Sequence, residues 1–161
     1  MMRWIRRGAA LLCGLSIATL LASRGENLAA GAAALAGLAW GAADRLPGRL
    51  FGAANACMLI ASTVATALLA LRGATVGRAV ITVALGLLAW NTGLFVARWP
   101  AAPAEAGRRY LAAVAKPLLV GVSLGVSAPA AFGLLSVPAP VATLLMLLAC
   151  ALFIGIVRGA R

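Results

Sequence analysis

The sequence predicts an all-α membrane protein, a bundle of six transmembrane helices with both termini in the cytoplasm. Three observations lead to this prediction: hydrophobic residues make up 64% of the 161 residues, charged residues make up only 11%, and the charges gather between long apolar runs. A soluble domain of this length needs far more polar surface to cover its core. We therefore expect a single integral membrane domain over 1–161.

The first two apolar runs predict helices over 8–23 and 27–43. Each is roughly 24 Å long at a helical rise of about 1.5 Å per residue, which is less than the ~30 Å hydrocarbon core of a bilayer. Trp4 and Ile5 can extend the first run, and the flank Arg45–Pro47 can extend the second. Whether both runs cross the membrane completely stays open.

Four longer runs complete the expected bundle, with helices over 50–71, 79–97, 117–137 and 139–157. Lipid offers no hydrogen-bond partner to bare backbone groups, so a spanning segment closes its hydrogen bonds within itself as a helix or within a closed barrel. A barrel needs strands of alternating polarity, and no segment of the sequence alternates in this way. Six helices are therefore the natural interpretation.

The distribution of cations predicts the orientation. Eleven Lys and Arg residues fall in the two tails, the 2–3 loop and the 4–5 loop, whereas the other side carries Arg24, Arg72 and Arg78 alone. Cytoplasmic loops carry the excess of Lys and Arg in membrane proteins. We therefore expect both termini inside, with the cations facing anionic headgroups of the cytoplasmic leaflet.

The composition also excludes several function classes. The net charge of +11 lies at helix ends and not on one basic face, so nucleic-acid binding is not expected. Histidine is absent, and the three carboxylates Glu26, Asp44 and Glu105 stand far apart in the sequence. No nucleophile motif or phosphate-binding loop occurs. We expect no enzyme activity, no cofactor and no metal site.

Three polar residues inside the apolar runs are the candidate ligand-binding residues: Asn55, Asn91 and Thr92. Asn55 and Asn91 lie in the same half of two antiparallel helices, and an unpaired amide in lipid is costly, so each side chain should face protein. One interpretation is a small polar pocket at that depth. The other is an interhelical hydrogen bond that fixes helix pairing.

Small residues predict where helices approach closely. The pairs Gly37 with Gly41 and Gly121 with Gly125 each stand four apart on one helix face, which lets two backbones come together in lipid. Pro129 removes a backbone hydrogen bond from the fifth predicted helix and predicts a bend there. The bend is either a static feature of packing or a functional hinge.

Two functions are consistent with these features. The first is a non-catalytic membrane subunit or scaffold that packs against a membrane-protein partner or a second copy of the chain. The alternative is a transport or ligand-binding module for a small, mainly apolar molecule. In size and topology alone, the expected protein is similar to the substrate-binding subunits of energy-coupling-factor transporters, with no motif residue to carry the similarity further. An excess of Arg over Lys with abundant Ala and Gly favours a bacterial source and the cytoplasmic membrane.

Overall fold

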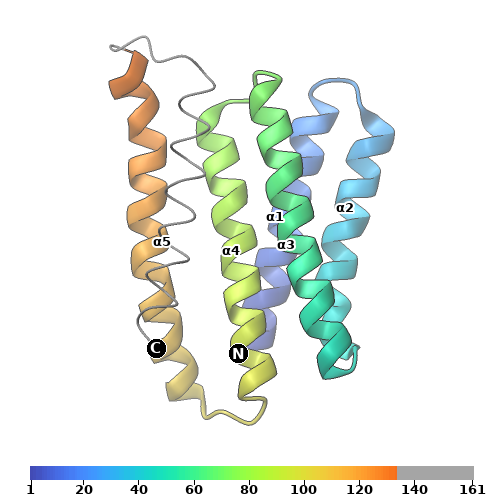
Figure 1. Cartoon of the computed structure of the whole chain (residues 1–161), viewed down its shortest axis with the longest axis vertical. Helices are drawn as coiled ribbons and strands as arrows, with labels where there is room; N and C mark the ends of the chain where they lie inside the picture. Colours follow the sequence, from blue (N-terminus) through green and yellow to red (C-terminus); the bar gives the residue numbers. More distant parts are fainter. Residues whose placement is uncertain (134–161) are drawn as a thin grey trace. The chain divides into compact units, whose positions relative to one another are not determined.

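The computed structural model describes residues 1–133, and the chain divides into two units, Met1–Val126 and Ser127–Arg161. The prediction of an all-helical chain is confirmed for the described residues (Figure 1). The expected helix over 139–157 lies outside them. The elements in chain order are α1 (Met2–Ala22), α2 (Asn27–Ala42), the short 3-10 helix η1 (Ala43–Arg45), α3 (Gly48–Leu71), α4 (Val76–Arg98) and α5 (Ala104–Gly133).

Helices α1 to α4 form two antiparallel hairpins that pack together (Figure 1). Helix α1 packs against both α2 and α4, and α3 packs against α4, so α1 is the central helix of the bundle. Both hairpin turns use a glycine with positive φ, Gly25 at 78° and Gly73 at 88°. Glycine adopts this left-handed conformation without the steric cost that other residues meet, which is why both turns can be so short.

The core of the bundle is built around small side chains of α1. Ala9, Ala10 and Cys13 are almost completely buried, and Trp40 of α2 and Ala89 of α4 pack against the same cluster. Small residues let neighbouring helices approach closely, and this contact replaces the hydrophobic drive that lipid does not supply. Several of the abundant Ala and Gly residues are thus used where α1 meets its neighbours.

In the described part of the chain, four helices are long and apolar enough to cross a membrane. They are α1, α3, α4 and the segment Ala104–Ser127 of α5. Helix α2 has 16 residues and is about 24 Å long by the helical rise. The structure therefore supports a helical, membrane-embedded protein.

Two helices begin more than a helical turn earlier than the sequence predicts. Helix α1 begins at Met2 and not at residue 8, because Arg6 and Arg7 are helical residues with partners in the bundle. Helix α5 begins at Ala104 and not at Pro117, so the residues after Pro103 and the expected fifth span form one helix. Proline costs one backbone hydrogen bond, but a break in lipid would expose several backbone groups, so the helix continues through Pro117.

The start of α1 and the turns between helices divide the described cations between two ends of the bundle. One end holds the start of α1, the turn between α2 and α3, and the turn between α4 and α5 (Figure 1). We call it the arginine-rich end, because it carries Arg3, Arg6, Arg7, Arg45, Arg49, Arg98, Arg108 and Arg109. At the opposite end, Arg24 Nη2 donates to the Arg72 carbonyl at 2.7 Å, which ties the two hairpin turns together.

Candidate functional site

A buried arginine lies at the arginine-rich end. Arg6 of α1 is completely buried, and its guanidinium donates to the carbonyl oxygens of Trp40 at 3.0 Å and Gly41 at 2.9 Å. These carbonyls belong to the last turn of α2, where a helix has no further backbone donors of its own. A cation is favourable there for its hydrogen bonds and for its charge. The expectation that Arg6 faces headgroups is therefore wrong: it closes the end of α2 from inside.

The carboxylate of Asp44 holds Arg6 and Arg7 together. Arg7 donates to Asp44 Oδ2 from Nη2 at 2.7 Å and from Nε at 3.2 Å, and Arg6 Nη2 lies 3.4 Å from Oδ1. The Phe51 ring lies under Arg6, with the guanidinium carbon 5.0 Å from the ring centre. Together these contacts fix the start of α1 against α2, η1 and α3.

The pKa of Asp44 is lowered from its ordinary value of 3.8. Burial alone acts to raise this pKa, but the hydrogen bonds from Arg7 and the charges of Arg6 and Arg7 together outweigh it. Asp44 is therefore a charged carboxylate at neutral pH. Two buried polar atoms here have no hydrogen-bond partner among the described residues: Arg6 Nε donates none, and Asp44 Oδ1 accepts none.

Asn55, a predicted ligand-binding residue, links three helices. Its Oδ1 accepts a hydrogen bond from Trp40 Nε1 of α2 at 2.8 Å, and its Nδ2 donates to the Trp90 carbonyl of α4 at 3.1 Å. The side chain is completely buried, and it lies against Gly93, where an added Cβ would be 2.7 Å from Nδ2. These contacts correspond to the interhelical hydrogen bond that the sequence left as one of two interpretations.

The other two candidate ligand-binding residues are also engaged within the protein. Asn91 Nδ2 donates to the Leu87 carbonyl at 2.9 Å, and the Asn91 carbonyl accepts the Tyr110 hydroxyl at 3.1 Å. The Thr92 hydroxyl is completely buried and donates to the Leu88 carbonyl at 2.7 Å. In the part of the chain that the structure describes, no hydrogen bond joins these side chains to one another or to Asn55.

Removing the Asn55 amide should destabilise the bundle. We expect Asn55→Ala to lower the free energy of unfolding by about 1–3 kcal/mol, because the buried Trp40 indole N–H loses its acceptor. Thermal unfolding of the purified protein in detergent, followed by circular dichroism, measures the change. Asn27→Ala removes an exposed amide at the start of α2 and is the control; an equal loss in both variants would contradict the assigned role of Asn55.

The predicted packing glycines differ in what they contact. An added Cβ on Gly37 would lie 2.9 Å from Gly14 Cα, and one on Gly125 would lie 2.9 Å from the Val80 methyl groups. Gly41 is looser, with Arg7 O at 3.7 Å, and Gly121 has nothing within 4 Å among the described residues. Pro129 lies within α5, where only the backbone is described.

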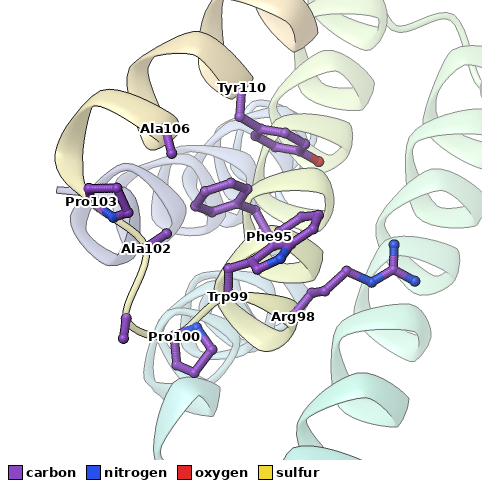
Figure 2. A pocket seen from close by; sticks show the side chains of 9 residues that line it. Phe95, Arg98, Trp99, Pro100, Ala102, Pro103, Ala106 and Tyr110 are labelled. Carbon is purple, nitrogen blue, oxygen red and sulfur yellow. The ribbon is translucent and has the colours of Figure 1, made fainter.

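An open pocket of about 570 Å³ lies at the turn between α4 and α5. Figure 2 shows Phe95, Trp99 and Tyr110 gathered on one side of it, with Pro100 and Pro103 on the turn. The Phe95 ring centre is 4.6 Å from that of Tyr110 and 5.4 Å from that of Trp99, and Arg98 lies over the Trp99 ring at 5.6 Å. The volume is within the range of small-molecule sites, roughly 300–1,000 Å³.

Neither the arginine network nor the aromatic pocket was predicted as a site. The signal for the network is a carboxylate, Asp44, directly before Arg45 at an end where the arginines are in excess. The signal for the pocket is the spacing of aromatic residues around the prolines of the turn, a pattern that is also typical of side chains anchored at a membrane interface. Comparisons with protein-family models, with curated proteins and with solved structures find no match to this chain.

Proposed function

We propose that this protein is a non-catalytic subunit of the bacterial cytoplasmic membrane, with six spanning helices and both termini inside, that packs against partner membrane proteins. The observation that carries the proposal is the outer face of α2. This face combines exposed large residues with exposed small ones, and it includes Leu28, Ala29, Gly31, Ala32, Leu35, Ala36 and Ala39.

The small residues on this face suit a protein neighbour. In lipid, helices associate because small side chains allow backbones to approach, and an added Cβ on Gly31 would meet nothing within 4 Å. Helix α2 is also shorter than a hydrocarbon core, and association with a neighbour is one way in which a short helix is accommodated. Among the described residues α2 packs mainly against α1, so the opposite face of α2 is available to a partner.

The polar residues of the bundle support the same proposal. The side chains of Asn55, Asn91 and Thr92 each donate a hydrogen bond to a backbone carbonyl of the protein. None of these residues lines either of the described pockets. A transport path needs polar side chains that can exchange partners. A bundle that uses them for its own helix pairing is better suited to assembly.

Photo-cross-linking in native membranes tests the proposal. A photoreactive amino acid at Ala36, on the outer face of α2, should give a discrete cross-link to a membrane protein or to a second copy, identified by mass spectrometry. Ile60 is the matched control, because it is exposed on α3 among large apolar residues. Cross-links to lipid alone at Ala36, or the same partner from both positions, would contradict the proposal.

The aromatic pocket favours a second candidate, a binding module for a small, mainly apolar molecule. Its aromatic and proline lining offers flat apolar surfaces, and the Arg98 guanidinium at its edge can orient a polar group. Mild purification followed by mass spectrometry of small molecules tests this candidate. A compound that copurifies with the protein and is lost in Trp99→Ala would support it.

A further inference from the structure

A second open pocket, about 150 Å³ in volume, lies between the ends of α1 and α2. We call it the arginine groove, and its walls are Arg7, Leu11, Leu38, Gly41, Ala42 and Arg45. The arginines and the leucines lie at different depths along the groove. On α1 the arginine comes one turn nearer the helix end than Leu11, and on α2 Leu38 precedes the turn that carries Arg45. The groove is thus basic at the arginine-rich end and apolar one turn deeper.

The basic end of the groove has an excess of positive charge. Arg6, Arg7 and Arg45 stand beside Asp44, and this single carboxylate is shared by Arg6 and Arg7. Arg45 is exposed and forms no ion pair among the described residues. Three cations against one carboxylate leave two positive charges uncompensated, which attracts an anion to this end.

One of the groove arginines is already held in place. The Arg7 guanidinium lies between the Asp44 carboxylate and the Trp4 ring, whose centre is 5.3 Å from Cζ. Asp44 takes hydrogen bonds from Nε and Nη2, whereas Nη1 makes none among the described residues. A guanidinium fixed in this way loses little conformational freedom when it binds a further anion, and Arg is well suited to phosphate.

We propose that the arginine groove binds one anionic phospholipid, with the phosphate group at Arg7 and Arg45 and the start of an acyl chain between Leu11 and Leu38. A phospholipid presents charge and hydrocarbon in the same order as the groove. Gly41 contributes to the fit, because it places no side chain between the two helices. A free phosphate shares the first contact but gains nothing from the apolar walls, so the lipid is the favoured ligand.

Native mass spectrometry of the full-length protein in a mild detergent tests the proposal, with phosphatidylglycerol as the probe and phosphatidylcholine as the neutral comparison. We expect one retained phosphatidylglycerol, and weaker retention of phosphatidylcholine. Arg45→Gln should reduce phosphatidylglycerol binding about fivefold, the effect of one basic side chain at an anionic lipid surface. Arg49→Gln removes the same charge at the same end but outside the groove, and it should leave binding unchanged. Equal losses in both variants would overturn the proposal, because they indicate diffuse attraction.

A second measurement on the wild-type protein avoids dependence on the variants. Phenylglyoxal modifies accessible arginines, and phosphatidylglycerol should protect Arg45 several-fold more than Arg49. The same reaction with inorganic phosphate, and with phosphatidylcholine, distinguishes binding of a free phosphate from binding of an anionic phospholipid. Protection of Arg45 by inorganic phosphate equal to that by phosphatidylglycerol would overturn the lipid assignment, as would equal modification of both arginines with the lipid present.

Discussion

Asp44→Asn is expected to lower the free energy of unfolding by about 3–5 kcal/mol, because breaking a buried ion pair by removing one partner leaves the other charge uncompensated. The charge left behind is that of Arg6, whose side chain is completely buried under the last turn of α2. Asparagine has nearly the same shape as aspartate, so the substitution removes charge with little change in volume. Chemical or thermal unfolding in detergent, monitored by circular dichroism, gives the value.

Glu105→Gln is the matched control for this prediction. Glu105 also pairs with an arginine, Arg109 at 2.6 Å, but both side chains are largely exposed, at 74% and 81%. Exposed pairs of this kind contribute at most about 1 kcal/mol. If the two substitutions destabilise the protein equally, the burial of Arg6 is not what makes Asp44 important.

Acid should reproduce part of the Asp44→Asn effect in the wild-type protein. The pKa of Asp44 is lower in the folded state than in the unfolded state, so folding is favoured by the charged form. This contribution is fully present above the ordinary pKa of 3.8 and is lost as the pH falls through the lower, folded value. Asp44 should therefore contribute equally to the free energy of unfolding at pH 5 and at pH 7. Below about pH 4 the wild-type protein should lose this contribution, and Asp44→Asn should show no such loss.

The helical character of the chain could be predicted because it depends on the local composition of each segment. Hydrophobicity and length place helices over the runs that became α2, α3 and α4, with ends that differ by a few residues. The starts of α1 and α5 could not be found in this way. A cationic segment can continue a helix when its charges find partners, and the partners of Arg6 and Arg7 come from a different part of the chain.

The residues of the candidate site could likewise be predicted only in part from the sequence. The sequence identifies Asn55 as a side chain that must face protein, because an unpaired amide in lipid is costly. It does not identify Trp40 and Trp90 as the partners, since hydrogen-bond partners depend on how helices rotate against one another. Gly37 is likewise identifiable as a small residue on a helix face, whereas its neighbour Gly14 becomes evident only when α1 and α2 are seen to cross there.

The crossing of α1 and α2 is the basis of the second large effect. An added Cβ on Gly14 would lie 2.7 Å from the Gly37 Cα and 2.9 Å from the Ala33 carbonyl oxygen, and both are backbone atoms. Backbone cannot rotate aside as the end of a flexible side chain can. We expect Gly14→Ala to lower the free energy of unfolding by about 1–3 kcal/mol, because the two helices must move apart.

Gly8→Ala is the matched control on the same helix, since nothing lies within 4 Å of the position that its Cβ would take. Alanine is favoured over glycine within a helix by roughly 0.5–1 kcal/mol, so this variant should be as stable as the wild type or more so. The two variants carry the same chemical change on one helix, and only Gly14→Ala should lower stability in the same unfolding experiment. Because α2 packs mainly against α1 among the described residues, moving the two helices apart should also weaken the cross-link from Ala36 in Gly14→Ala. A Gly14→Ala protein as stable as Gly8→Ala would mean that α1 and α2 do not meet at Gly14 and Gly37.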